Sequence, residues 1–203
     1  FLPDCYLFSV GKVYCIRNLK KEVRVIGNAV DSSKLVRRAV NGDQSAFIEL
    51  VDLYRRSMYA TAVAVTHNEN DTLDAIQDTI LILWEKLSTL RRPDLFKTWM
   101  TRILVNRCCS LMRKGCREMP SEILREEEQE QREWDTSLDV REALQRVSED
   151  DRLILQLFYF EDFSLRQIAQ ILSITPNAAK MRLSRSRKRF LEQYETEAQY
   201  ERS

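Results

Sequence analysis

The chain has 203 residues, enough for one or two small domains, and 44% of them are hydrophobic. Only 4 Gly and 4 Pro occur, which leaves little turn material for an all-β fold and favours long helices. The formal net charge is +1, from 32 basic and 31 acidic residues, so the protein is no general polycation and its positive charge must be segregated to bind an acidic partner.

Cysteine and histidine usage gives no sign of a metal site. The number of cysteines is odd, no C-x-x-C pair occurs, and one histidine is too few for the usual zinc spacings. We expect reduced thiols, no metal and no cofactor. The chain also lacks a glycine-rich phosphate loop and a nucleophile–base motif, so we expect neither an enzyme nor a small-molecule substrate. The residues concerned are Cys5, Cys15, Cys108, Cys109, Cys116 and His67.

Residues 1–30 differ from the rest of the chain. They show no periodic pattern, and we do not expect a signal peptide here, because the apolar patch is short and no basic region precedes it. The codons for residues 21–23 can form a purine-rich bacterial ribosome-binding site, and Val30 can be read from a GTG start codon. We therefore expect the working protein to begin near Val30, with residues 1–30 an upstream extension translated in frame.

From Asp31 to residue 117 the hydrophobic pattern is helical and predicts a four-helix unit. A polar break at 67–71 separates the second helix from the third, and Pro93 interrupts the chain before the fourth. Gly115 is expected to end the fourth helix. The four expected helices are 35–40, 46–66, 72–88 and 95–114.

The composition changes after this unit. Residues 118–133 carry seven acids, two arginines and almost nothing apolar, so they cannot bury enough surface to offset their ordering entropy. We expect residues 118–137 to form an acidic linker. Helical character resumes at 138, Ser148 is expected to cap a helix over 149–160, and a polar tail occupies 196–203.

Residues 164–190 hold seven Lys/Arg and no Asp or Glu, with two helix starts inside them. Ser164 and Gln167 have the spacing of a capping box. Thr175 followed by Pro176 is typical of an N-cap and a first helical position. The connection at 173–175 has the length of a helix-turn-helix, whose second, basic helix suits a DNA major groove.

The second of these helices has an apolar side and a polar side. Its apolar positions, with Ser186, are expected to face the domain core: Ala179, Leu183, Ser186, Phe190 and Tyr194. The polar positions then project outward, where the earlier ones can reach base edges: Asn177, Lys180, Met181, Ser184, Arg185 and Lys188. Arg182, Arg187 and Arg189 are better placed for phosphates. A merely solvated basic face explains the charge but neither the two caps nor the apolar stripe.

Two further helices carry weaker signals. The helix at 71–84 has an acidic edge with Leu81 as an apolar knob, although many surface helices look similar. The helix that begins near 96 mixes aromatic and basic residues, which suits single-stranded nucleic acid. Phe96 and Trp99 can equally be core residues, and for Trp99 the core is favoured because it lies on the apolar stripe.

Taken together, residues 35–192 resemble the bacterial sigma-70 family, specifically the small extracytoplasmic-function (ECF) group, which keeps only sigma regions 2 and 4. The stretch from Gln167 to Phe190 is also similar to Firmicute stress-response members. The family's polymerase-binding helix, D-x-x-D-h-h-Q-E/D-T-h-h-h-x-W, is matched by Asp71, Asp74, Gln77, Asp78, Thr79 and Trp84. The run from Phe96 to Lys114 resembles the promoter-melting helix, and 164–190 resembles region 4. Departures at Ser110, Gln167 and 178–179 bear on the promoter sequence.

The resemblance implies an all-α fold of two small helical domains joined by a flexible linker, with region 2 at 31–117 and region 4 at 138–195. It implies an RNA polymerase sigma factor that directs promoter-specific transcription initiation in an envelope or extracytoplasmic stress response. Such a protein is cytoplasmic, and a membrane-bound anti-sigma factor holds it at the inner face of the membrane. The acidic linker would thread towards the polymerase RNA channel.

The resemblance also implies contacts for the two partners, core RNA polymerase and promoter DNA. Region 4 would rest on the β flap, and the β′ clamp coiled coil would receive Asp74, Gln77, Asp78, Leu81 and Trp84. The minus-ten strand, with one base flipped into the loop at 88–95, would contact Arg91, Arg92, Lys97, Arg102, Asn106, Arg107, Arg113 and Lys114. The minus-thirty-five duplex would contact Arg166, Asn177, Lys180, Met181, Arg182, Ser184, Arg185, Arg187, Lys188 and Arg189.

The main alternative is a stand-alone helix-turn-helix regulator that binds duplex DNA without polymerase. That reading leaves the helix at 71–84 unexplained. A change of Asp78 to lysine discriminates the two, because it should abolish polymerase binding while sparing the fold.

Overall fold

The computed structural model describes residues 32–118 and 143–200, with side chains for 32–113 and 143–194. Within these two stretches the regular structure is helical, and no strand occurs in either. The expected extension at 1–30 and most of the expected acidic linker lie outside the described residues. None of the described helices combines the length and the apolar character that crossing a bilayer requires.

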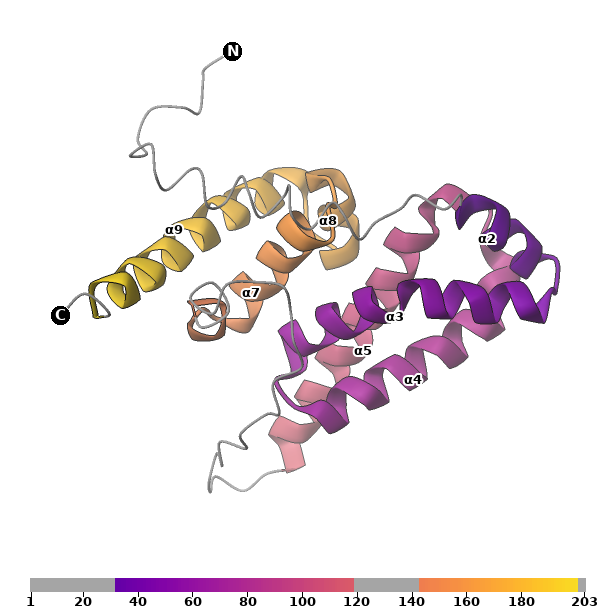
Figure 1. The fold of residues 1–203 in the computed structure, drawn as a ribbon, viewed down its shortest axis with the longest axis horizontal. Coiled ribbons are helices and arrows are strands. Elements are labelled where there is room, and N and C mark those ends of the chain that lie inside the picture. Colours follow the sequence, from indigo (N-terminus) through magenta and orange to yellow (C-terminus); the bar gives the residue numbers. More distant parts are fainter. Residues whose placement is uncertain (1–31, 119–142, 201–203) are drawn as a thin grey trace, which may run out of the picture.

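The N-terminal unit consists of α2 (Ser32–Val40), α3 (Gln44–Thr66), α4 (Glu69–Lys86) and α5 (Phe96–Glu118). Helices α3, α4 and α5 pack against one another along their lengths, and α2 lies near one end of them (Figure 1). Two short 3-10 turns, η2 (Leu87–Thr89) and η3 (Pro93–Leu95), connect α4 to α5. The four helices expected from the sequence are therefore present.

Local chemistry sets where these helices begin. The Asp43 carboxylate accepts a hydrogen bond of 3.0 Å from the backbone N–H of Ala46 and so caps α3. The Asn68 side chain caps α4, which begins at Glu69, so the expected break at 67–71 shortens to two residues. Gly42 ends the preceding turn at φ +92°, a conformation that a residue with a Cβ adopts only with strain.

The expected end of the fourth helix at Gly115 is wrong, because α5 continues to Glu118. A glycine inside a helix costs only about 1 kcal/mol relative to alanine. The good helix formers that follow it can offset that cost, so a glycine without a favourable left-handed turn after it does not end a helix.

The C-terminal unit consists of α7 (Glu149–Leu155), α8 (Leu165–Leu172) and α9 (Pro176–Tyr200), preceded by a helical turn at 143–146. The expected helix over 149–160 changes character at Gln156, where its last turn becomes π-helical (η4, Gln156–Phe160). The predicted capping box of α8 is confirmed, since Ser164 and Gln167 cap each other. Helix α9 runs past 195, so the expected polar tail is partly helical.

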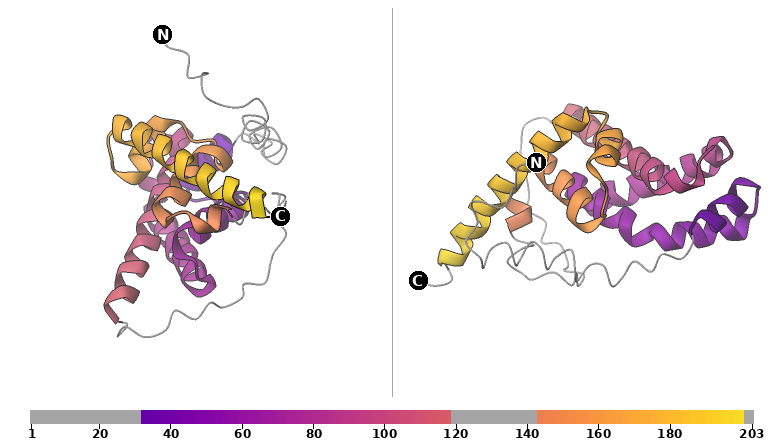
Figure 2. Two further views of the ribbon diagram at one scale, coloured as in Figure 1. Left: turned by 90° about the vertical axis from the view of Figure 1, so that its left-hand side faces the viewer. Right: turned by 90° about the horizontal axis from the view of Figure 1, so that it is seen from above.

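The two units are packed against each other. Helix α7 lies against α3, and α8 lies against α5, while α9 extends away from the N-terminal helices (Figures 1 and 2). Buried side chains from both units, such as Met58 and Leu104 in one and Leu157 and Ile168 in the other, belong to one hydrophobic cluster. Two helical units are thus present as expected, and in this structure they are docked.

Candidate nucleic-acid interface and partner-binding helix

The second helix of the helix-turn-helix, α9, has the two sides that its sequence predicts. Ala179, Leu183, Ser186 and Phe190 are buried against α7 and α8, and Tyr194 packs against the same cluster. The opposite side is open to solvent, and the residues expected to project from it are all exposed: Asn177, Lys180, Met181, Ser184, Arg185 and Lys188. The turn before α9 places Ser173 at φ +54°, and Thr175 accepts a hydrogen bond from the N–H of Ala178.

The three arginines expected to contact phosphates are engaged within the protein. Arg182 pairs with Asp150, and Arg189 pairs with Asp151. The Arg187 guanidinium lies over the rings of Phe158 and Tyr159, with centroids at 5.1 and 5.4 Å. Their phosphate contacts remain a prediction, as does that of the exposed Arg166 on α8.

The partner of Arg189 is a buried carboxylate. Asp151 on α7 is 2% exposed and accepts hydrogen bonds from the Ser186 hydroxyl at 2.6 Å and the Ser148 hydroxyl at 2.8 Å. Burial favours the neutral acid, but the bonds from Ser186, Arg189 and Ser148 outweigh it, so the pKa of Asp151 is lowered. The sequence predicted only the cap at Ser148, because nothing in it links Asp151 to positions 35 and 38 residues away.

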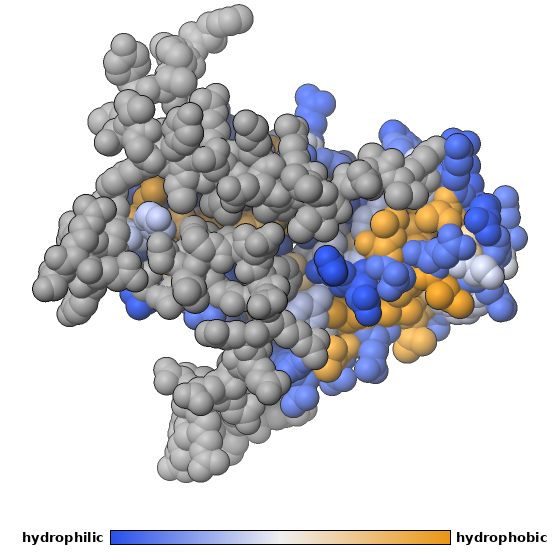
Figure 3. All heavy atoms as spheres, viewed as in Figure 1, coloured by the Kyte–Doolittle hydropathy of each residue, from blue (hydrophilic) through white to orange (hydrophobic). Residues whose placement is uncertain are grey.

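The acidic helix α4 presents an apolar knob among polar groups. Leu81 is 61% exposed and Trp84 is 48% exposed, and the Trp84 and Phe47 rings form a T-shaped pair with their centroids 5.0 Å apart. Asp74 and Gln77 are exposed on the same helix. Apolar side chains also gather on the surface on the side of the molecule where α2, α3 and α4 lie (Figure 3).

Asp78, the remaining residue of the expected polymerase-binding set, forms an ion pair within the protein. The half-buried Asp78 carboxylate lies 3.0 Å from the Arg107 guanidinium on α5. A change of Asp78 to lysine therefore removes an ion pair between α4 and α5 as well as a surface charge. Arg107 belongs to the expected minus-ten set, so the pair joins the two predicted contact surfaces.

The expected minus-ten residues lie along α5 and in the connection before it. Arg91, Arg92, Asn106 and Arg113 are exposed, and Arg92 pairs with Asp94 at 2.7 Å. Lys114 lies on α5, but its side chain is outside the described part.

The aromatic residues of α5 belong to the core. Phe96 is buried, and Trp99 packs against the hydrophobic cluster with its ring 6.2 Å from that of Phe96. The core reading favoured for Trp99 is confirmed.

Two cations of the expected minus-ten set meet the C-terminal unit. The Lys97 ammonium lies 2.9 Å from the Glu161 carboxylate and donates a second hydrogen bond, also of 2.9 Å, to the Glu161 carbonyl. Arg102 donates to the Ser173 hydroxyl at 3.3 Å. Sequence reasoning missed Glu161, since a lone acid after an apolar helix carries no signal of a partner 64 residues away.

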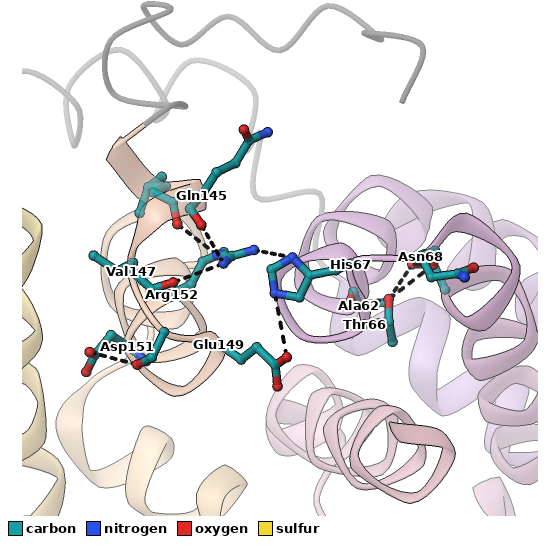
Figure 4. A network of polar contacts seen from close by, with 12 residues as sticks. Ala62, Thr66, His67, Asn68, Gln145, Val147, Glu149, Asp151 and Arg152 are labelled. Carbon is teal, nitrogen blue, oxygen red and sulfur yellow. Dashed lines mark hydrogen bonds and ion pairs between the residues drawn. The ribbon is translucent and has the colours of Figure 1, made fainter. Parts of the chain in front are cut away.

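A second junction joins the end of α3 to α7 (Figure 4). Arg152 donates to the carbonyls of Leu144, Gln145 and Val147 at 2.8 to 3.1 Å, and its guanidinium lies 2.6 Å from Nδ1 of His67. Because arginine only donates, that nitrogen must accept, which requires a neutral imidazole. Burial, with the nearby Arg152 charge, lowers the pKa of His67 to about 4.

Both cysteines of the described side chains, Cys108 and Cys109, are free thiols, and burial raises the pKa of each. Cys108 is fully buried, and burial raises the pKa of its thiol to about 12. Across 32–113 and 143–194, His, Cys, Asp and Glu side chains form no group suited to holding a metal ion.

A helix-turn-helix whose second helix is basic and exposed is typical of DNA-binding proteins. Comparison with protein families makes the assignment specific. Residues 50–118 match the family described as Sigma-70 region 2, and residues 137–190 match Sigma-70, region 4. These two segments make up more than half of the chain, which therefore belongs to the sigma-70 family.

Individual relatives place the chain within this family. It is 29% identical over 137 residues to the RNA polymerase sigma factor SigV of Bacillus subtilis, covering 66% of this chain and 82% of that protein. It is 25% identical over 160 residues to the ECF RNA polymerase sigma factor SigM of Mycobacterium tuberculosis, covering 78% and 82%. The chain is thus an RNA polymerase sigma factor of the extracytoplasmic-function group, as the resemblance predicted.

Solved structures agree with this fold. The sigma factor RpoE of Bartonella quintana, crystallised with the anti-sigma factor NepR, aligns with a TM-score of 0.61 and 26% identity, over 73% of this chain and 96% of that one. CnrH, solved with the cytosolic domain of CnrY, aligns with a TM-score of 0.59 and 21% identity, over 81% and 97%, and shows the fold alone. The stand-alone regulator reading is not favoured.

Proposed function

We propose that this sigma factor divides its work between separate helices. Helix α4 holds core RNA polymerase, α9 reads the minus-thirty-five duplex, and α5 with the connection before it holds the melted minus-ten strand. The proposal rests chiefly on Leu81, an apolar side chain left 61% exposed among polar groups on a helix with its own buried face. The proposed boundaries are 31–117 for region 2 and 138–195 for region 4.

The surface of α4 suits a protein partner. An exposed leucine with an adjacent tryptophan offers apolar area that association can bury, and Asp74 and Gln77 beside them select a partner with a basic rim. The β′ clamp coiled coil, with its basic and apolar face, has this chemistry. Asp78 contributes through its pair with Arg107 as well as through its own charge.

The exposed side of α9 suits the major groove. Asn177 and Lys180 lie in the first turns, where a recognition helix reaches base edges, and Arg185 follows one turn later. Region 4 would also rest on the β flap. On the N-terminal unit, Arg91 and Arg113 are open to a single strand, which basic residues hold through its phosphates.

We further propose a cytoplasmic protein that catalyses no reaction of its own and serves an envelope or extracytoplasmic stress response. When uninduced, a membrane-bound anti-sigma factor would hold it at the inner face of the membrane. The anti-sigma partner, though not its place at the membrane, is supported by the relative RpoE, whose solved complex contains the anti-sigma factor NepR. An anti-sigma factor that covers both units would mask α4 and α9 together.

Two matched substitutions test the division of work. Leu81 on α4 and Met181 on α9 are apolar side chains of nearly equal exposure, 61% and 59%. We expect Leu81→Asp to abolish co-elution with sigma-free polymerase while leaving the circular dichroism spectrum and melting temperature unchanged. Met181→Asp should leave co-elution intact and reduce run-off transcription from minus-thirty-five-dependent promoters.

The proposal requires that Leu81→Asp loses co-elution and that Met181→Asp keeps it but transcribes less. If Leu81→Asp still co-elutes with polymerase, α4 does not hold the enzyme. If Met181→Asp transcribes like wild type, α9 does not read the promoter.

A further inference from the structure

We propose that the C-terminal unit docks on α5 as an internal competitor for the minus-ten strand, with the Glu161 carboxylate in the place of a DNA phosphate. The inference rests on the proposed function, which makes Lys97 and Arg102 ligands of that strand. In the docked state Glu161 holds Lys97, and Arg102 is bonded to Ser173 although it stays exposed, so free sigma factor binds the strand weakly until the units separate.

The contact at Glu161 has the chemistry of a phosphate site. Its side chain is 8% exposed, and one carboxylate oxygen, Oε2, receives both the Lys97 ammonium at 2.9 Å and the Ser57 hydroxyl at 2.5 Å. Lys97 also lies 4.9 Å from the centre of the Phe163 ring. A nucleic-acid phosphate also presents an anionic oxygen. Such an oxygen could take the position of Glu161 Oε2 and accept from the same ammonium and hydroxyl.

The turn that presents Glu161 is well ordered by its own hydrogen bonds. It follows the π-helical turn η4, and the N–H groups of Glu161 and Phe163 donate to the carbonyls of Gln156 and Leu157, both at 3.0 Å. Between them Asp162 adopts φ +56°. The carboxylate is therefore held in position before it meets α5, which lowers the entropic cost of the contact.

A second pair of contacts extends the docking along α5. Gln167 of α8 donates to the Thr98 hydroxyl at 3.2 Å, and one turn further Arg102 donates to Ser173. Ser173 lies in the turn of the helix-turn-helix. Separation of the units breaks one ion pair and a small set of hydrogen bonds, which a bound strand can replace. It also exposes the apolar side chains that the two units share in one cluster, so we expect it to accompany polymerase binding.

The test compares Glu161→Gln with Asp52→Asn in the full chain. Both remove one negative charge, but Asp52 is exposed and its ion pair is with Arg55, one turn further along its own helix. The probe is a fluorescein-labelled single-stranded 12-mer of mixed sequence at low salt. We expect Glu161→Gln to bind it about tenfold more tightly than Asp52→Asn, the effect of losing one charged contact.

Two further measurements separate docking from general charge effects. Thr98→Val keeps the side-chain volume and net charge but loses the bond from Gln167, so it should also tighten binding, by a smaller factor. Glu161→Lys places two ammonium groups together, and small-angle scattering of the DNA-free protein should show a larger radius of gyration than for Asp52→Asn.

Equal affinity of Glu161→Gln and Asp52→Asn overturns the inference, as does expansion of Glu161→Lys without any gain in strand affinity. Run-off transcription by the wild-type protein with core polymerase tests the proposed function separately. If wild type initiates and the Glu161 variants match Asp52→Asn, only the internal competition is wrong. If wild type neither initiates nor binds the strand, the proposed minus-ten site itself fails.

Discussion

Asp151 shows how one buried charge organises the C-terminal unit. Its carboxylate joins the cap of α7 at Ser148 to Ser186 and Arg189 on α9, so α7 and α9 share a single anionic centre. A buried carboxylate is tolerated when hydrogen bonds and a cation compensate it, as they do here. Arg189 consequently supports the fold of the helix-turn-helix, whatever it also contributes to DNA binding.

Replacing Asp151 with asparagine should lower the free energy of unfolding by about 3 kcal/mol, because it leaves Arg189 and two hydroxyls without their anion. The change should be measured by urea denaturation at pH 7. The lowered pKa of Asp151 fixes the pH dependence: its stabilisation is present above the unfolded-state pKa of about 3.9 and is lost as pH falls through the lower folded-state value. The difference between wild type and variant should therefore shrink only below about pH 4.

Of the hydrogen bonds around Asp151, the sequence predicted the one at the Ser148 cap but not the one from Ser186. The Ser148 cap follows from a serine before an acidic first turn, a purely local pattern. The bond to Ser186 does not, because Ser186 stands at an inward helical position where the pattern indicates packing alone. A polar residue on an apolar stripe signals that a partner exists but not which one.

At the scale of the element, the sequence predicts which residues of α9 are buried, but it predicts the contacts of the outer side chains less well. Helical spacing places the buried residues correctly, since burial follows the period of the helix. It does not distinguish an arginine that reaches solvent from one held by a neighbouring helix. Arg185 is exposed, whereas Arg187 lies over two aromatic rings of η4.

A DNA-binding test should use cations of α9 that are exposed to solvent rather than held by a neighbouring helix. Arg185→Ala should cost about 1–3 kcal/mol at its preferred promoter and relax specificity if it contacts a base. Lys188, whose ammonium is exposed and 3.8 Å from Glu192, should behave as a phosphate contact. Lys188→Ala should weaken binding to all sequences alike and reduce the slope of log affinity against log salt by about 1.

Fluorescence anisotropy on matched and mismatched minus-thirty-five duplexes, over a salt series, measures both effects. Polymerase holoenzyme should be used, so that region 4 is presented in its working position. Indistinguishable behaviour of the two variants would mean that the helix does not separate base reading from phosphate binding in this way.

At the scale of the whole molecule, the sequence predicted two helical units but not their docking. The contacts that join them link residues far apart in the chain: Ser57 with Glu161 over 104 positions, and Arg102 with Ser173 over 71. No periodicity or spacing connects such pairs. From the sequence, Lys97 and Arg102 are predicted to contact DNA, whereas in the structure both have partners in the other unit.

Docking has a thermodynamic consequence that can be measured without DNA. If the units are coupled, destabilising one must lower the stability of the other by up to the free energy of the contact. Trp84 and Trp99 lie in the N-terminal unit, so in a Trp134→Phe background their fluorescence reports that unit alone. Asp151, by contrast, acts wholly within the C-terminal unit.

We expect Asp151→Asn to lower the thermal midpoint of this fluorescence by about 2–4 °C for each kcal/mol of destabilisation. Adding Glu161→Lys, which separates the units, should make the midpoint insensitive to Asp151→Asn. The interaction energy of this double-mutant cycle is the coupling that docking provides. A midpoint unaffected by Asp151→Asn even in the docked protein would show that the two units unfold independently, and that the contact at Glu161 is too weak to compete with a DNA strand.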